Sequence, residues 1–362
     1  MVVMHNGITA TARENLSVTR AFLQRMPKVD LHRHLEGSLR LRTLAEIATE
    51  HGLDLPARSI EELRPYVQVT DQQEQDFHRF LAKFRLLRRF YRSREALQRI
   101  AREAVADAAA DNIRYLELRF NPVALSRAQN FSLADVTDWV SEAITRAQTD
   151  YDTTVRLILQ IGRDENLRVA EEIIHLALAY RQRGVVGIDL AGDEVNYPPH
   201  RFAPLFRKAA EAGLGVTVHA GEAGGAENVQ AAIQLLHARR IGHGVRVVEN
   251  STIARFARER GVTLEVCPTS NFQTGVVRTF AQHPLPDLIA LGLRVTINTD
   301  DPSVSDTTLT DEYMVARVAI GLELDQIRQA VFNAVEAAFL SEEERQRLLP
   351  RFQEWSGEWP GE

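Results

Sequence analysis

The chain has 362 residues, with 43 basic and 49 acidic side chains, a net charge of −6, eleven histidines and one cysteine, Cys267. One cysteine excludes an intramolecular disulfide and any zinc site with two or more cysteine ligands, so a transition metal would need histidine and carboxylate ligands. The slightly acidic charge, without a basic cluster, argues against nucleic-acid binding. No secretory leader and no run of about eighteen apolar residues is evident, so we expect a cytoplasmic protein that does not bind membranes.

Eight short runs rich in Val, Ile and Leu predict eight strands, and a segment with helical periodicity follows each of them. The runs are residues 29–35, 113–120, 154–162, 185–192, 215–221, 240–244, 263–270 and 294–301. Predicted helices between them include 167–184, 228–240 and 250–261, the last two with Asn228 and Asn250 as expected N-caps. Apolar strands that alternate with helices indicate a parallel sheet. The pattern predicts an α/β fold, a (β/α)8 TIM barrel, with a doubly wound open sheet as the alternative.

Two long segments depart from this alternation. Residues 36–112 separate the first two strands and contain at least three helical stretches. Because this segment follows a strand end, we expect a helical insertion that forms a lid over the carboxyl-terminal mouth of the barrel. Residues 303–362 also have helical character and are expected to cover the outside or bottom of the barrel. We therefore expect residues 1–362 to form a single domain, a metal-dependent hydrolase barrel.

Four of the eleven histidines lie in the predicted strands. His32 and His34 are two residues apart, so both side chains point to the same face of their strand, which in a barrel is the interior. The other two, His219 and His243, end later strands. Three acidic residues also lie at the ends of predicted strands or directly after them, namely Glu222, Asp300 and Asp301. In barrel enzymes the carboxyl ends of the strands carry the active site.

Three neutral imidazoles and one carboxylate suit a borderline cation such as Zn²⁺. The alternative for any single histidine is a buried imidazole bonded to a backbone carbonyl, but burying all four with three acids and no function would be costly. The competing interpretation is a two-metal site, because an HxH pair on the first strand also occurs in many binuclear hydrolase barrels, which commonly bridge their metals with a carbamylated lysine at the end of the fourth strand. The only lysines, Lys28, Lys83 and Lys208, lie elsewhere, so we predict one metal.

Segments along nearly the whole chain resemble the adenosine deaminase family of the amidohydrolase superfamily. The matching segments are MPKVDLHRHLEGSL (26–39), FLAKF (80–84), YLELRFNP (115–122), GIDLAGDE (187–194), VHAGE (218–222), RIGHGV (240–245), CPTSN (267–271) and NTDDP (298–302). The resemblance implies hydrolytic deamination of adenosine and 2′-deoxyadenosine to inosine or deoxyinosine and ammonia. It also implies one Zn²⁺ per chain, with His32, His34, His219 and Asp300 as ligands.

The resemblance further assigns catalytic and binding roles. Zinc-bound hydroxide would attack C6 of the purine while Glu222 donates a proton to N1, which requires a protonated carboxyl. His243 would orient the hydroxide, and Asp301 would contact both the hydroxide and N7. The backbone N–H of Gly192 would contact N3, and His34 also borders the substrate. Asp189 is a weaker candidate that would position a ligand.

FLAKF has two interpretations. Its apolar stripe could simply belong to the core. In the family the equivalent helix flanks the substrate opening, which implies that Phe80, Leu81 and Phe84 line the pocket.

The sequence departs from the family at Glu36, where adenosine-specific members usually carry an Asp that reaches the 5′-hydroxyl of ribose. The extra methylene leaves deaminases of free adenine and of 6-aminodeoxyfutalosine as alternatives. The expected partner is a small purine nucleoside. Two other classes also remain, a purine-binding barrel without catalysis and a metal-dependent esterase or lactonase.

Overall fold

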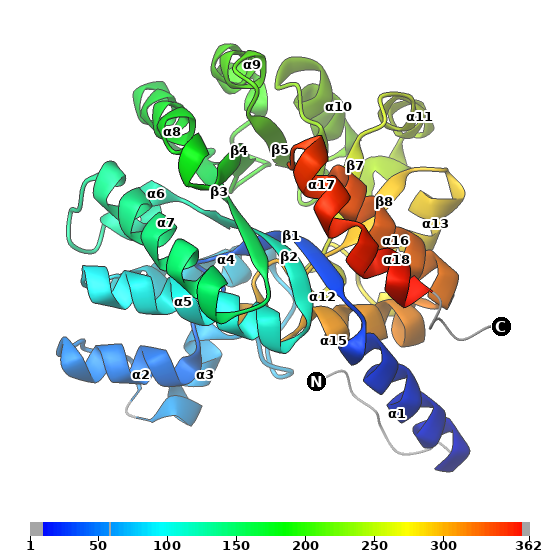
Figure 1. Ribbon diagram of the computed structural model, residues 1–362, viewed down its shortest axis with the longest axis horizontal. Coiled ribbons are helices and arrows are strands. Elements are labelled where there is room, and N and C mark those ends of the chain that lie inside the picture. Colours follow the sequence, from blue (N-terminus) through cyan, green and yellow to red (C-terminus); the bar gives the residue numbers. More distant parts are fainter. Residues whose placement is uncertain (1–9, 58, 357–362) are drawn as a thin grey trace.

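The computed structural model describes residues 10–57 and 59–356, and its centre is a parallel eight-stranded barrel (Figure 1). Neighbouring strands pair in sequence order. They are β1 (Lys28–His34), β2 (Ile113–Phe120), β3 (Thr154–Gly162), β4 (Val185–Ala191), β5 (Gly215–Ala220), β6 (Arg240–His243), β7 (Thr263–Val266) and β8 (Arg294–Ile297). Most strand residues are fully buried, as expected for strands that have side chains inside the barrel and helices outside.

The seam between the first and the last strand lies at their carboxyl ends. The amide of Asp300 donates to the carbonyl of His32 at 2.8 Å, and the amide of His34 donates to the carbonyl of Asp300 at 2.8 Å. Nearer the amino end, the Leu31 amide bonds the Asn298 side chain at 3.0 Å. The predicted (β/α)8 barrel is thereby confirmed.

A ring of helices surrounds the strands (Figure 1). Its main members are α5 (Arg94–Ala110), α7 (Leu133–Asp150), α8 (Leu167–Ala179), α9 (Ala203–Glu211), α10 (Ala226–Leu235), α11 (Ser251–Glu259), α13 (Leu285–Ala290) and α16 (Leu324–Ala337). Asn250 caps α11 as predicted, because its side chain accepts the amides of Thr252 and Ile253. The cap predicted at Asn228 is wrong: α10 begins two residues earlier, after an extended Gly225.

The predicted strands at 263–270 and 294–301 end earlier than expected. Each is followed by a short helix with proline at its first position, α12 (Pro268–Gln273) and α14 (Pro302–Ser305). Proline suits the first turn of a helix because it has no amide hydrogen to pair and its φ is already helical. The residues between strand and helix therefore lie in the mouth of the barrel.

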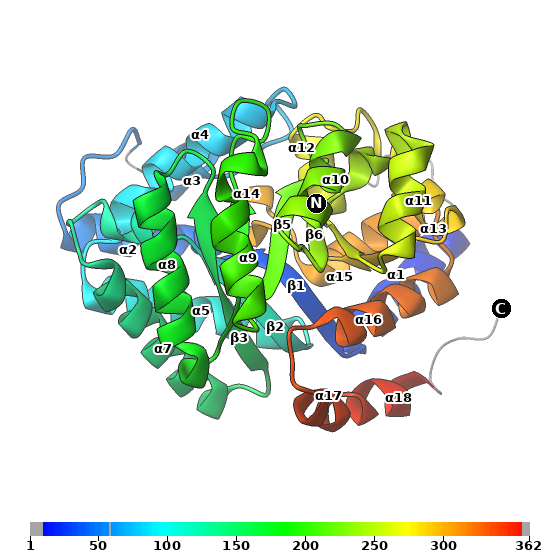
Figure 2. The ribbon, with the colours of Figure 1, turned by 90° about the horizontal axis from the view of Figure 1, so that it is seen from above.

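The remaining helices lie outside this set of eight. After β1 come α2 (Leu41–Glu50), α3 (Ile60–Val67), α4 (Phe77–Leu87) and the 3-10 turn η1 (Arg88–Phe90). The others are α1 (Ala10–Arg25), α6 (Pro122–Ser126), α15 (Leu309–Met314), a π-helix (Val315–Ile320), α17 (Glu342–Leu348) and α18 (Pro350–Ser356). Figure 2 shows α4 at one end of the barrel and α17–α18 at the opposite end. Within residues 10–57 and 59–356, no helix combines the length and apolar character needed to cross a membrane.

Phe339, in the connection between α16 and α17, closes the amino-terminal end of the barrel. Its amide donates to the buried Glu117 carboxylate at 2.6 Å, and the Arg240 guanidinium lies 3.6 Å from its ring centre. A β-carbon on Gly215 would lie 2.3 Å from the ring. The glycine at the start of β5 therefore makes space for the aromatic ring.

We predict that Gly215→Ala lowers the free energy of unfolding by about 1–3 kcal/mol, because a methyl group there overlaps the Phe339 ring. Denaturant unfolding of the single and double variants checks this. Phe339→Leu should be less harmful in the Gly215→Ala background than alone. Strictly additive losses would show that the two positions do not compete for the same space.

Candidate active site

Four buried ligand-type side chains meet at the carboxyl end of the barrel. His32 and His34 come from β1, His219 from β5, and Asp300 from the segment after β8. The Nε2 atom of His34 lies 3.3 Å from both the His32 and the His219 Nε2 atoms. One oxygen of Asp300 is 3.2 Å from Nε2 of His32 and 3.2 Å from that of His34. The structure therefore brings together the four predicted metal ligands.

Two carboxylates orient these imidazoles. Nδ1 of His32 lies 2.8 Å from Glu265, and Nδ1 of His219 lies 3.1 Å from Asp189. An acceptor at Nδ1 places the proton there and leaves the Nε2 lone pair facing the centre of the cluster. Converging lone pairs repel one another unless a cation lies between them. The donor set thus fits a metal ion.

One buried arginine links the two carboxylates. Arg119 of β2 lies 3.1 Å from Asp189 and 2.9 Å from Glu265, and it also donates to the carbonyl of Leu31 at 2.6 Å. Although burial opposes the charged carboxylate, Arg119 and Arg240 hold the pKa of Glu265 well below its usual range. Both carboxylates therefore stay charged inside the barrel and keep accepting from the imidazoles.

Two site residues adopt backbone conformations that L-residues seldom use. His243 has φ +59° and Asp300 has φ +60°, both in the left-handed region. Strain of this kind is common at functional sites and is maintained by the surrounding structure. At Asp300 the two backbone hydrogen bonds across the seam hold the conformation.

Glu222 and His243 lie beside the ligand cluster. His243 Nε2 is 3.6 Å from Glu222 and 3.9 Å from Asp300, and its Nδ1 is 3.1 Å from the Asn271 amide nitrogen. Burial lowers the pKa of His243 well below its usual value, so the imidazole is neutral. Burial, reinforced by the charge of Asp300 and of Glu194, raises the pKa of Glu222 well above its usual value. The surroundings therefore favour the protonated form of the Glu222 carboxyl and the neutral form of the His243 imidazole.

A third carboxylate holds the loop that carries Glu222. Glu194 accepts the backbone amides of Gly221 at 2.6 Å, Glu222 at 3.1 Å and Gly224 at 2.9 Å. Three amide donors to one buried carboxylate leave the loop little freedom. Glu222 is in this way fixed relative to His219, three residues before it.

A pocket adjoins this cluster, and the predicted substrate-contacting residues line it. They are His34, Glu36, Phe80, Leu81, Phe84, Gly192 and Asp301. Helix α4 supplies the three apolar side chains, so the FLAKF stripe faces the pocket as well as the core. Burial and the charge of Asp300 raise the pKa of Asp301 well above its usual value. A β-carbon at Gly37 would lie 1.9 Å from the Asp301 carboxylate, so glycine is needed there for that carboxylate to reach its position.

Several residues at the site escaped the sequence prediction. Glu265, Arg119, Glu194 and Asn271 position the ligands or the loop, and Phe77, Arg88, Gln160 and Ala191 complete the pocket lining. The sequence held a partial signal for two of them. Arg119 and Glu265 are charged residues in predicted strands, so each needs an ionic partner within the barrel, but the sequence does not say which one.

Cys267 lies within ligand distance of His32, His243 and Asp300, which together form a second possible cluster. Burial, followed by the charge of Asp300, raises the pKa of this thiol well above its usual value. Metal binding requires the thiolate. The cluster without cysteine is therefore the better metal site.

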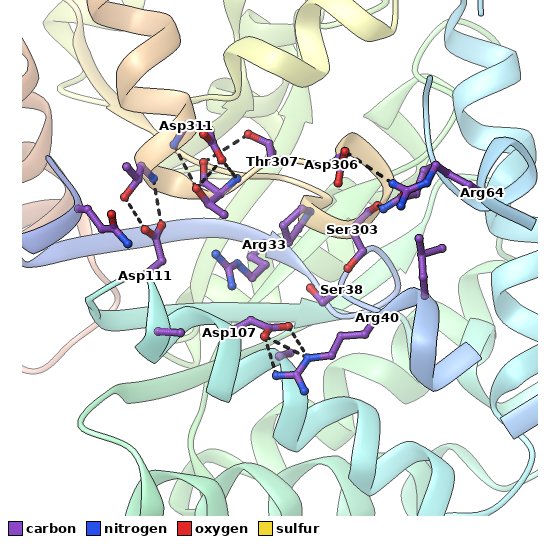
Figure 3. A pocket seen from close by; sticks show the side chains of 18 of the residues that line it. Arg33, Ser38, Arg40, Arg64, Asp107, Asp111, Ser303, Asp306, Thr307 and Asp311 are labelled. Atoms are coloured by element: carbon purple, nitrogen blue, oxygen red, sulfur yellow. Dashed lines mark hydrogen bonds and ion pairs between the residues drawn. The ribbon is translucent and has the colours of Figure 1, made fainter. Parts of the chain in front are cut away.

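A wider cavity of about 580 Å³ lies on the outer side of β1, between α1, α3, α5 and α14 (Figure 3). Its arginines are already paired with acids: Arg20 lies 2.7 Å from Asp311, Arg40 lies 2.6 Å from Asp107, and Arg33 lies 3.1 Å from Asp30. The charges within this cavity are thus largely compensated, and it contains none of the metal-binding side chains.

Comparison with known proteins identifies the relationship. Residues 27–355 match the family model described as adenosine deaminase. The chain is 40% identical to the adenosine deaminase of Klebsiella pneumoniae (strain 342) over 326 residues, which cover 90% of this chain and 97% of that protein.

Solved structures agree with this relationship. The adenine deaminase of Arthrobacter aurescens superposes with a TM-score of 0.85 at 30% identity, covering 92% of this chain and 99% of that one. An amidohydrolase from Burkholderia ambifaria with bound Zn superposes with a TM-score of 0.85 at 27% identity, covering 98% and 96%. With the match along nearly its whole length, these findings show that the chain belongs to the adenosine deaminase family and is a hydrolytic deaminase that uses a metal cofactor.

Proposed function

We propose that this enzyme hydrolyses the 6-amino group of adenosine and 2′-deoxyadenosine, producing inosine or deoxyinosine and ammonia, with one Zn²⁺ per chain. The observation that carries the proposal is the position of the buried Glu222 carboxyl, 3.6 Å from His243 and next to the four candidate ligands, where burial raises its pKa well above the usual value. A site of this composition can deliver a proton to a ring nitrogen while a water molecule attacks the neighbouring carbon.

The ligand spacing supports zinc. Ligands about 2.0–2.1 Å from a tetrahedral Zn²⁺ lie roughly 3.3 Å from one another. The His34 Nε2 atom lies 3.3 Å from those of His32 and His219, and one Asp300 oxygen lies 3.2 Å from those of His32 and His34. When bound, the ion would supply an acidified water at neutral pH. The end of β4, Asp189–Ala191, contains no lysine that could bridge a second metal.

Glu222 would protonate N1 of the purine. An aromatic purine resists attack at C6, and a proton on N1 makes that carbon more electrophilic. The elevated pKa of Glu222 keeps the proton available at neutral pH. His243 is neutral and held at Nδ1 by Asn271, so its Nε2 can orient the attacking water and stabilise the charge that develops.

Asp301 and Gly192 would position the base. Asp301 lies directly after the ligand Asp300, and its Oδ1 atom is buried without a hydrogen-bond partner in the described chain. That atom is suited to an edge contact with the purine at N7. Gly192 has φ +109°, a conformation that glycine adopts without strain, and its backbone N–H would bond N3 on the opposite edge.

We predict that the purified enzyme releases ammonia from adenosine and 2′-deoxyadenosine. The similarity to adenosine deaminases over 326 residues favours these substrates over adenine and 6-aminodeoxyfutalosine. An ammonia assay with all four compounds checks this. Turnover of adenine or 6-aminodeoxyfutalosine, with none of adenosine, would reverse the choice. Ester hydrolysis without ammonia release would overturn the function altogether.

We predict that Glu222→Gln lowers kcat by about 10²–10⁴-fold and leaves zinc content near one per chain, because the amide keeps the shape of the side chain but cannot serve as the proton donor. Steady-state kinetics and metal analysis check this. Glu227→Gln, an exposed position on α10, is the matched control and should retain wild-type activity. Wild-type activity in Glu222→Gln would exclude this carboxyl as the donor.

We predict that Glu265→Gln weakens zinc binding by about 10–100-fold, because the neutral side chain no longer fixes the His32 tautomer. Competition with a chromogenic chelator measures the affinity. Glu249→Gln removes an exposed ion pair with Arg246 and serves as the control. Equal zinc affinity in the Glu265 variant and the wild type would argue against an orienting role.

A further inference from the structure

Several polar atoms in the substrate pocket are buried and have no hydrogen-bond partner in the described chain. Those on pocket-lining residues are Glu36 Oε2, Arg88 Nε, Gln160 Oε1 and Asp301 Oδ1. Buried polar groups are almost always paired in folded proteins, so orphaned atoms that share one pocket indicate that a ligand completes them. The proposed function uses only Asp301 for the base and leaves three residues to be explained.

Arg88 is the least expected of the three. It stands in η1, directly after α4, and its Nε atom is buried without a hydrogen-bond partner in the described chain, although its charge opposes the rise in pKa that burial causes in the nearby Glu36 and Glu165. The next residue, Arg89, donates to the carbonyl of Asp54 at 2.8 Å. The arginines of the cavity outside β1 are likewise paired with acids (Figure 3). Arg88 thus brings a guanidinium with an unused Nε–H donor into the pocket.

The acceptors in the same pocket limit what this guanidinium can bind. Glu36 accepts the Asn121 amide at 2.8 Å through Oε1, which leaves Oε2 free to accept another hydrogen. Gln160 offers a second free acceptor. A phosphate dianion would satisfy Arg88 but would bring two negative charges beside the carboxyl groups of Glu36 and Asp301, opposite a single guanidinium. A hydroxyl group both donates and accepts, so it can bond a guanidinium and a carboxyl oxygen at once.

We propose that Arg88 is a specificity-determining residue that binds, together with Glu36, one sugar hydroxyl of the nucleoside. Gln160 binds a neighbouring hydroxyl of the same sugar. The inference rests on the proposed function, which places the purine at Glu222 and Asp301. A substrate that consists of the base alone leaves Arg88, Glu36 and Gln160 unpaired. The pocket therefore selects ribosides and deoxyribosides over free adenine.

The test compares Arg88→Leu with Arg89→Leu, which removes a neighbouring arginine that does not line the pocket. Substrates are adenosine, its 2′-, 3′- and 5′-deoxy analogues, adenosine 5′-monophosphate and adenine. Hydrogen bonds to charged groups of this strength correspond to about 10–100-fold in kcat/KM. We expect Arg88→Leu to lower kcat/KM for adenosine by about 10–100-fold. For the one analogue that lacks the contacted hydroxyl, the same substitution should lower kcat/KM by less than about threefold. Arg89→Leu should match wild type throughout.

Equal losses on adenosine and on all three deoxy analogues would overturn the proposal. The proposal would also be overturned if the wild type preferred adenosine 5′-monophosphate and Arg88→Leu lost only the activity on that compound. Arg88 would then bind the phosphate group and not a sugar hydroxyl. Calorimetric binding of inosine and hypoxanthine gives a readout independent of turnover. Wild type should bind inosine more tightly, and Arg88→Leu should remove most of the difference. If wild type fails to deaminate adenosine yet shows this binding difference, the proposed function fails and the sugar contact stands.

Discussion

The catalytic centre depends on the pairing of Arg119 with two carboxylates inside the barrel. Glu265 and Asp189 each accept from the Nδ1 atom of a ligand histidine, and both bond the same guanidinium. None of these groups could be buried alone, since an isolated charge in a barrel interior is very costly. Together they satisfy one another, and the orientation of His32 and His219 follows from that mutual satisfaction.

The same pocket keeps chemically similar acids in opposite states. The imidazoles of His32 and His34, each 3.2 Å from Asp300, lower the pKa of Asp300 well below the usual range although burial acts against this. Glu222 has no such neighbours, and burial together with the nearby negative charge raises its pKa. A metal ligand must be ionised and a proton donor must not be. The roles proposed for these two carboxyls thus follow from their neighbours.

The strands and the shared orientation of His32 and His34 were predictable from local pattern, whereas the choice of His219 and Asp300 as the other candidate ligands came from the family resemblance. Apolar runs with helices between them specify the barrel, and histidines two apart on one strand must share a face. The helix start at Ala226 was not predictable, because an extended Gly225 replaced the more usual Asn cap. Arg119 and Glu265 required knowledge of which strands face each other across the interior, which no single segment contains.

Arg88 illustrates the same limit. The segment from α4 to η1 contains Arg79, Arg85, Arg88 and Arg89, and all four look alike in the sequence. Only the packing of α4 and η1 at the end of the barrel determines that Arg88 lines the pocket while Arg85 and Arg89 are exposed. A specificity residue of this kind is set by the tilt and rotation of one helix.

The seam between β1 and the chain after β8 has a consequence for biosynthesis. The residues that close the barrel, His32, His34 and Asp300, are also those that meet at the metal site. A nascent chain presents the two histidines early, but their carboxylate partner leaves the ribosome only when nearly the whole barrel has been made. Until then the incomplete set of candidate ligands should bind a metal ion only weakly. We therefore expect productive metal loading to follow the placement of the last strand.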